Sequence, residues 1–295
     1  WNGIHFTQYS DDWGGQSQLD YCVIEKGNDY NYFSESTNQP NLINNSKIQN
    51  ALLDGARYLS ATGSITNCQF LNNGRYPLYY LNTTADPVHT GNTYTGNVIN
   101  RIALSGGNYS VNRTLTNDGI AYYVLDNMTI SEYTTAPRLT INAGVALEFA
   151  SGKKLTVGGG YPYSGSLYAL GTAANRVVFR AYSSVDGDWE GIHFTQYSDD
   201  WGGVSLMDYV TVRHANNQNI LIENTSQPTL TNGIIRNSLH DGIVLTGAAN
   251  PVIQNNSFSN HPGYPLRFSN WDCDPYLSGN TFTSNGMNYI SLSGG

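Results

Sequence analysis

The stretch at residues 252–283 reads VIQNNSFSNHPGYPLRFSNWDCDPYLSGNTFT. Phe258 and Phe282 stand at an interval of 24 in it, and so do Asn256 and Asn280. Short runs of β-branched or aromatic residues alternate with Asn, Gly, Ser and Pro, which is typical of short strands joined by turns. The apolar residues do not follow the spacing of an amphipathic helix. The stretch therefore predicts β coils that stack every two dozen residues.

The same interval recurs in the rest of the chain. It separates Phe70 from Tyr94, and it also separates Leu78 from Ile102. Asparagines follow it in three series, which we expect to form hydrogen-bonded ladders: Asn50, Asn73 and Asn97; Asn237, Asn260 and Asn285; Asn232, Asn256 and Asn280. We predict an all-β parallel β-helix, a solenoid of about 12 coils of roughly 21–25 residues. If Phe282 is stacked in its core, Phe282→Ala is expected to cost about 3–5 kcal/mol.

A much longer repeat is superimposed on this interval. Residues 1–15 read WNGIHFTQYSDDWGG and residues 189–203 read WEGIHFTQYSDDWGG, so the two stretches differ only at Asn2 and Glu190, with an offset of 188. We expect the chain to be a window cut from a longer tandem array. The repeat predicts one continuous β-helix over residues 1–295 with three parts: a first copy at 1–107, a segment seen once at 108–188, and a second copy at 189–295.

The composition excludes several classes of protein. Charged residues make up 12% of the chain, with 14 Lys and Arg against 22 Asp and Glu, so the formal net charge is −8. Such a chain lacks the basic surface of a nucleic-acid binder, and no nucleic-acid partner is expected. No apolar run is long enough to span a membrane. Three cysteines in 295 residues do not make a disulfide scaffold.

Several segments resemble right-handed parallel β-helix repeats of the pectate-lyase-like superfamily: LTINAGVALEF at 139–149, LTV at 155–157, LGTAAN at 170–175, VVF at 177–179 and WEGIHF at 189–194. The variant is the one common in large secreted or surface-displayed bacterial repeat proteins. The resemblance implies a right-handed, single-stranded solenoid and an extracellular or cell-surface location. It implies little about activity, because this fold hosts lyases, hydrolases, tailspikes, adhesins and inert stalks.

One loop is identical in the two copies, at residues 7–15 and 195–203. Its aromatic side chains could stack on sugars, and its paired carboxylates at Asp11, Asp12, Asp199 and Asp200 are the oxygen ligands that Ca²⁺ prefers. We expect no cofactor, with Ca²⁺ at these carboxylates as the one alternative. The alternatives are a turn that closes the coil with its tryptophan folded back as a lid, or a recent duplication. The predicted ligand-binding residues are Tyr9, Asp11, Asp12, Trp13, Tyr197, Asp199, Asp200 and Trp201.

No other residues form a duplicated reactive constellation. His5 and His193 are expected to point outward as solvated side chains, and they lie about 38 Å apart by strand spacing, too far to share a metal. The acidic residues around the start of the second copy are either a solvated acidic turn or candidates for the paired carboxylates of a glycosidase: Asp186, Asp188, Glu190, Asp199 and Asp200. Asn2 replaces Glu190 in the first copy, however, which argues against an essential acid. We therefore expect no catalytic residue.

These observations favour a non-catalytic structural or adhesive segment of a long extracellular repeat protein, on a cell surface or in a filament. Its expected partners are other copies of itself, associating end to end or side by side, and a polysaccharide or cell-surface glycan. Two alternatives remain on the same fold. One is a polysaccharide lyase or glycoside hydrolase, and the other is a glycan-binding module that uses the aromatic residues of the repeated loop.

Overall fold

A computed structural model describes residues 1–39 and 42–292, so the last three residues of the second copy lie outside the described residues. The described residues form short strands and turns, with two single-turn 3-10 helices, η1 (Asp12–Gly14) and η2 (Asp200–Gly202). The 35 strands recur in threes, which gives about 12 coils. None of the helices in the described part is long and apolar enough to cross a membrane.

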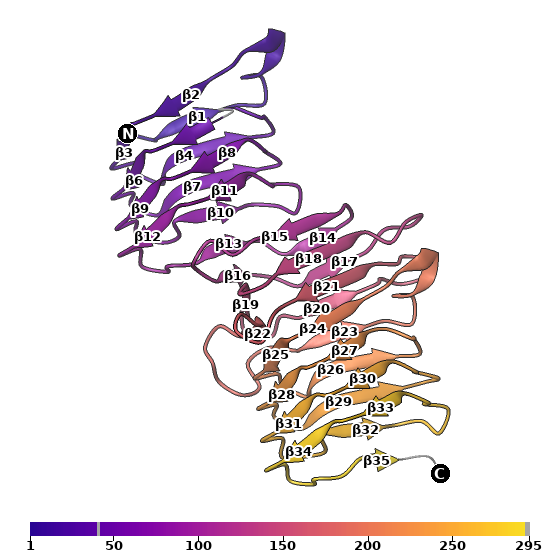
Figure 1. Cartoon of the computed structure of the whole chain (residues 1–295). Helices are drawn as coiled ribbons and strands as arrows, with labels where there is room; N and C mark the ends of the chain where they lie inside the picture. The colour runs from indigo at the N-terminus through magenta and orange to yellow at the C-terminus, as the bar shows by residue number, and fades with distance from the viewer. Residues whose placement is uncertain (40–41, 293–295) are drawn as a thin grey trace. The chain divides into compact units, whose positions relative to one another are not determined.

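The chain divides into two compact units. Unit 1 holds Trp1–Gly106 and Asp118–Tyr123, and unit 2 holds Gly107–Asn117 and Val124–Gly295. Strand β16 (Tyr122–Val124) falls at the boundary between them. In both units the strands lie above one another as rungs (Figure 1). That a single β-helix runs continuously over residues 1–295 stays a prediction.

Unit 1 consists of three stacks of parallel strands. Stack 1 contains β1 (Ile4–Phe6), β4 (Tyr30–Glu35), β7 (Asp54–Leu59), β10 (Leu78–Tyr80) and β13 (Ile102–Leu104). Stack 2 contains β2 (Gln18–Asp20), β5 (Leu42–Asn44), β8 (Ser64–Thr66) and β11 (Val88–Thr90). Stack 3 contains β3 (Val23–Glu25), β6 (Lys47–Gln49), β9 (Gln69–Leu71) and β12 (Thr93–Thr95).

Unit 2 has the same plan with more rungs. Its stack 1 contains β14 (Gly107–Tyr109), β17 (Met128–Ile130), β20 (Leu155–Val157), β23 (Ile192–Phe194), β26 (Gln218–Glu223), β29 (Asp241–Thr246), β32 (Leu266–Phe268) and β35 (Ser291–Leu292). Stack 2 contains β15 (Arg113–Leu115), β18 (Arg138–Asn142), β21 (Ser166–Leu170), β24 (Leu206–Asp208), β27 (Thr229–Thr231), β30 (Val252–Gln254) and β33 (Tyr276–Ser278). Stack 3 contains β19 (Ala146–Phe149), β22 (Val177–Ala181), β25 (Val210–Arg213), β28 (Ile234–Arg236), β31 (Ser257–Ser259) and β34 (Thr281–Thr283).

The parallel registers confirm that residues one coil apart are vertical neighbours. Phe258 pairs with Phe282 and Ile253 pairs with Leu277, and the two phenylalanine ring centroids lie 5.5 Å apart. Phe258 is fully buried, whereas Phe282 is only half-buried in β34. The predicted stacking is confirmed, but a half-buried ring is expected to lose less than the full core cost when Phe282 is changed to Ala. That cost belongs to Phe258, because it has a packed rung on both sides.

The core is a set of vertical columns of apolar side chains. In stack 3 of unit 2, Val212, Ile235 and Phe258 follow one another on successive rungs, and all three are fully buried. Side chains alternate between the two faces of a strand, so every second residue enters this column. Each coil has little apolar area of its own, and it is stabilised by burying that area against the coils above and below.

The asparagine ladders are present, but some of their predicted members are wrong. Asn73 Nδ2 donates to Asn97 Oδ1 at 2.8 Å, and Asn256 Nδ2 donates to Asn280 Oδ1 at 3.1 Å. The next member beyond Asn73 is Ala51, whose backbone N–H donates to Asn73 Oδ1 at 3.1 Å. The ladders therefore run through the buried residue that follows each turn. The predicted members that fall one residue outside them are Asn50, Asn237, Asn260 and Asn232.

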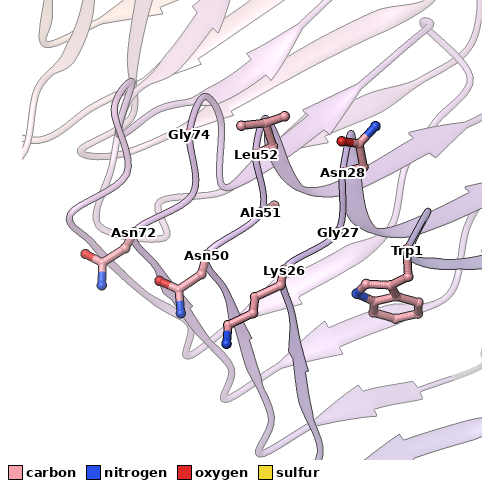
Figure 2. A pocket seen from close by; sticks show the side chains of 9 residues that line it. All are labelled: Trp1, Lys26, Gly27, Asn28, Asn50, Ala51, Leu52, Asn72 and Gly74. Atoms are coloured by element: carbon pink, nitrogen blue, oxygen red, sulfur yellow. The ribbon is translucent and has the colours of Figure 1, made fainter.

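The asparagines outside the ladders have a different role, because they make the turns themselves. Asn50 and Asn72 have φ of 54° and 53°, and Lys26 occupies the same place in the preceding coil with φ of 60°. Figure 2 shows their side chains leaving successive turns on one side, next to Trp1. Asparagine adopts the left-handed region more readily than other non-glycine residues. Of two adjacent asparagines, the first thus forms the turn, and the second forms hydrogen bonds to buried backbone groups.

Candidate functional site

The repeated loop has the same backbone in both copies. It follows β1 in the first copy and β23 in the second, and each contains a 3-10 turn centred on a tryptophan. Trp13 has φ of 60° and Trp201 has φ of 54°. The left-handed region costs a residue with a side chain about 1–2 kcal/mol. Both copies keep this strained conformation for a bulky residue, and retained strain of this kind points to function.

The strained turns project the indoles away from the coil. Trp13 is fully exposed and Tyr9 is also largely exposed. Trp201 is 59% exposed, and its Nε1–H donates to the carbonyl oxygen of Pro162 at 3.0 Å. Neither indole folds back as a lid over its own coil. The loop therefore displays an aromatic surface.

The first carboxylate of each loop holds the turn of the next coil. Asp11 Oδ2 accepts a hydrogen bond from the backbone N–H of Asn38 at 3.1 Å, and this bond lowers the pKa of Asp11. Asp199 Oδ2 accepts from both the backbone N–H and the hydroxyl of Ser226, at 2.9 and 2.8 Å. Part of the identity between the loops therefore has a structural reason.

The second carboxylate of each repeated loop, Asp12 or Asp200, does not test the expected Ca²⁺ site, which stays a prediction. Asp12 is exposed and Asp200 is half-buried, with its backbone carbonyl accepting a hydrogen bond from the Ser164 hydroxyl at 2.5 Å. Within residues 1–39 and 42–292, no group of three or more His, Cys, Asp or Glu side chains could hold a metal ion.

In unit 2 the loop meets aromatic residues from the two preceding coils. Tyr161 lies 5.8 Å from Tyr197, centroid to centroid, and Tyr133 lies 5.7 Å from Tyr163, both in edge-on geometry. All except Tyr197 are more than 40% exposed. The five rings come from the loops that join stack 1 to stack 2 on three successive rungs. We call this surface the aromatic strip: Tyr133, Tyr161, Tyr163, Tyr197 and Trp201.

Backbone contacts fix the three loops of the aromatic strip to one another. Glu132 and Ser164 exchange two backbone hydrogen bonds, at 2.9 and 3.0 Å, which join the first loop to the second. The Ser164 hydroxyl donates to the backbone carbonyl of Asp200, and the Trp201 indole N–H donates to the backbone carbonyl of Pro162. These two hydrogen bonds join the second loop to the third. The rings are thus held in place before any ligand arrives, which lowers the entropic cost of binding.

Sequence reasoning found Tyr197 and Trp201 but missed their three partners. Tyr133, Tyr161 and Tyr163 lie in the segment seen once, where no internal repeat marks them. The separation between Tyr161 and Tyr197 exceeds the coil interval, so periodicity does not connect them either. The one signal available was the glycine-flanked Tyr-Pro-Tyr sequence at residues 161–163, which marks an exposed aromatic loop.

The histidines were expected to be solvated, but each has a glutamate partner. His5 Nε2 lies 3.0 Å from Glu35 Oε2, and His193 Nε2 lies 3.1 Å from Glu223 Oε2. The two glutamates are themselves related by the offset of 188, so the pair is duplicated with the repeat. Burial lowers the pKa of His193, and Glu223 opposes this change.

A second cluster that the sequence did not reveal lies within unit 1. His89 Nδ1 is 3.3 Å from Asp118 Oδ2, and His89 Nε2 is 3.1 Å from the hydroxyl of Tyr122. Tyr94 also donates its hydroxyl to Asp118. Burial would raise the pKa of Asp118, but the hydrogen bonds from His89 and Tyr94 outweigh it and the pKa is lowered. The histidine and carboxylate are almost inaccessible, so we assign this cluster to stability.

The carboxylates considered for glycosidase chemistry are engaged with neighbouring side chains. Asp188 accepts a hydrogen bond from the Ser183 hydroxyl at 2.6 Å, and Glu190 accepts one from the Asn216 amide at 3.1 Å.

Comparison with known proteins agrees with the stacked architecture. Residues 173–295 match a family model described as a right handed beta helix region. No curated protein and no solved structure matches the chain. The match and the three-stack coils confirm the resemblance to right-handed parallel β-helix repeat proteins. This fold is compatible with many functions, so the surface has to indicate which one applies.

Proposed function

We propose that this protein is a non-catalytic, adhesive segment of an extracellular repeat protein and that it binds polysaccharide through the aromatic strip. The observation that carries the proposal is the convergence of five rings, four of them well exposed, on three neighbouring loops. Exposed aromatic groups gathered in one place mark interaction sites more often than scattered ones.

The chemistry of the strip suits a sugar polymer. Tyrosine and tryptophan present an apolar ring face together with a polar N–H or O–H group, which matches the apolar faces and hydroxyl groups of sugars. The loops succeed one another along the solenoid, so the rings form a line of subsites for an extended chain. Several weak contacts along one polymer add up to useful affinity, and tandem copies multiply them.

An enzyme on this fold is the second candidate, and the loop geometry gives it less support. Glycoside hydrolysis uses two carboxyl groups about 5–9.5 Å apart on either side of the scissile bond. In the repeated loop of unit 2, Asp199 is already engaged by the backbone and hydroxyl of Ser226. The strip thus offers stacking surfaces rather than a pair of free acids.

The binding proposal is tested by affinity electrophoresis of the full chain in gels that contain xylan, mannan or hydroxyethyl cellulose. We expect retardation in at least one of them, with Trp201→Ala and Tyr161→Ala each weakening binding about fivefold, or about 1 kcal/mol per ring. Trp271→Ala is the matched control, because this indole is 80% exposed and lies outside the strip.

Two outcomes would overturn the proposal. One is the absence of retardation by any of these polymers, and the other is a Trp201→Ala variant that binds like the wild type. Release of new reducing or unsaturated sugar ends from the same polymers would replace adhesion with the enzymatic candidate.

Self-association end to end or side by side is part of the same proposal. Strands at the end of a stack have unpaired backbone groups, which can pair with another chain. Electron microscopy of the native assembly should show filaments or laterally packed rods. Isolated single particles at high protein concentration would remove this part of the proposal.

A further inference from the structure

Stack 3 of unit 2 carries a column of charged side chains on its outer face. Glu148, Arg180, Arg213 and Arg236 occupy successive rungs of β19, β22, β25 and β28. We call the last three the arginine column. Rungs of a parallel stack are ~4.8 Å apart, so neighbouring guanidinium groups in this column are close enough to repel one another.

Only one end of the arginine column is neutralised. Arg180 donates to the carboxylate of Glu148, which is fully buried. Arg213 and Arg236 form no ion pair with any of the described residues, and the Nε atom of each is buried without a hydrogen-bond partner. Other arginines on the coil faces do have partners: Arg57 pairs with Asp29 and Asp54, Arg75 with Asp54, and Arg267 with Asp241.

The fold does not require arginine at these positions. The same two places in the first copy hold Glu25 and Gln49, which hydrogen-bond to each other at 2.7 Å. Where the first copy has a glutamate and a glutamine that hydrogen-bond to each other, the second copy therefore has two positive charges on neighbouring rungs. A change that leaves uncompensated charge on neighbouring rungs is costly unless a ligand of opposite charge offsets it.

A pocket lies beside the unpaired arginines. Its volume is about 390 Å³, and Arg213, Arg236 and Arg176 are among the residues that line it. Arg176 donates to the backbone carbonyls of Val210 and Asn232, at 3.2 and 2.7 Å, and it forms no ion pair with a carboxylate of the described residues. Three arginines thus line one pocket in a protein whose net charge is −8.

The titration of neighbouring groups agrees with a local positive potential. Burial, together with Arg180 and Arg236, lowers the pKa of Arg213. Burial and then Arg213 lower the pKa of His214 to about 4, while Asp186 opposes this change and Arg180 and Arg236 add to it.

We propose that this pocket binds a tetrahedral oxyanion, a sulfate or phosphate ester group carried by a polysaccharide. Two neighbouring guanidinium forks can supply four N–H groups to one anion. A single carboxylate has two oxygen atoms, which one fork already satisfies, whereas a sulfate or phosphate ester has three. This site is independent of the aromatic strip and stands even if the strip binds nothing.

The test measures binding of the full chain to dextran sulfate, with neutral dextran as the matched polymer. The test variant is Arg213→Glu/Arg236→Gln, which installs the residues that the first copy carries and changes the net charge by −3. The control is Lys47→Gln/Arg138→Glu, which makes the same change at two exposed residues outside the pocket. We expect the test variant to bind about tenfold more weakly, the control to bind like the wild type, and binding to weaken with salt.

Two further arms separate charge from geometry. Arg213→Lys/Arg236→Lys keeps the charge but loses the planar fork, so it should also bind more weakly than the wild type. Polygalacturonate carries carboxylates instead of sulfates, and it should bind more weakly than dextran sulfate. Equal binding of these two polymers, or a full-affinity lysine variant, would overturn the proposed tetrahedral specificity.

A local reporter shows whether the anion enters this pocket. We expect sodium sulfate and sodium phosphate to raise the pKa of His214, measured by NMR titration, because a bound anion screens the arginines beside it. An unchanged His214 pKa at saturating anion would overturn the site. Equal binding of dextran sulfate by the wild type and the test variant would also overturn the site. If the test variant changed its oligomeric state without losing polymer binding, the arginines would instead be assigned to contact with a second copy of the chain.

Discussion

His261 gives the sharpest test of the ladder architecture. It occupies the place that Asn73 occupies in the first copy, at the offset of 188, and it makes the same contacts to its coil. Its Nε2–H donates to the carbonyl of Ile235 at 3.0 Å, so the neutral ring must accept at Nδ1. There the hydroxyl of Ser238 donates to it at 2.7 Å. Protonation at Nδ1 would reverse this bond, so that the Ser238 hydroxyl accepts, and would remove the longer hydrogen bond from the backbone N–H of Ser238. It would also place a charge in a site that is 1% exposed.

The size of the effect follows from the pKa. Burial lowers the pKa of His261 from 6.5 to about 4. Because the unfolded chain binds the proton more tightly, the stability contributed by the neutral ring is complete above pH 6.5 and is lost as the pH falls toward 4. The loss is about 2 kcal/mol at pH 5 and about 3 kcal/mol at pH 4. His261→Asn should abolish this part of the pH dependence, since asparagine does not titrate.

Local hydrogen exchange is a suitable assay, because solenoids can unfold in segments. Exchange of peptides covering residues 234–264 should be compared between the wild type and His261→Asn at pH 7.5, 6, 5 and 4.5, after correction for intrinsic rates. The difference in opening free energy between the two proteins should change by about 2 kcal/mol between pH 7.5 and 5. Subtraction removes the titration of His193, His214 and the carboxylates, which are common to both proteins.

A constant difference across this pH range would refute the reasoning, because it would mean that His261 is protonated equally in the folded and unfolded states. The same conclusion would follow if NMR found the His261 ring charged at pH 5.5.

Three further changes test the core, the strained turn and the clamp between coils. Phe258→Ala should reduce the free energy of unfolding by about 3–5 kcal/mol and Phe282→Ala by roughly half as much, since one ring is fully buried and the other half-buried; equal losses in urea denaturation would contradict this. Trp13→Gly should be about 1 kcal/mol more stable than Trp13→Ala, because only glycine accepts φ of 60° without strain; identical melting curves would show that the turn is unstrained. Asp199→Ala should cost about 1–3 kcal/mol and speed exchange at Ser226, because it removes both hydrogen bonds that hold the next turn; unchanged exchange there would exclude the clamp.

The sequence alone determined the stacked coils. Only a solenoid places Phe258 beside Phe282 and Asn256 beside Asn280, and its coils are stable only when equivalent residues match on successive rungs. Periodicity is therefore a direct record of vertical contact. It left an ambiguity of one residue at the turns, because neighbouring asparagines such as Asn72 and Asn73 fit the same interval in different roles.

The tertiary structure decided which loops and charges meet. Tyr161 lies against Tyr197 and Arg180 lies on the rung next to Arg213, although both pairs are separated in the sequence by more than the coil interval. Loops of unequal length break the interval without disturbing the rungs, since a rung is fixed by backbone pairing and buried side chains while a loop is free to lengthen. The sequence period thus predicts which residues stack in the core. The surfaces where ligands would bind are formed by loop insertions of irregular length, so the period does not predict them.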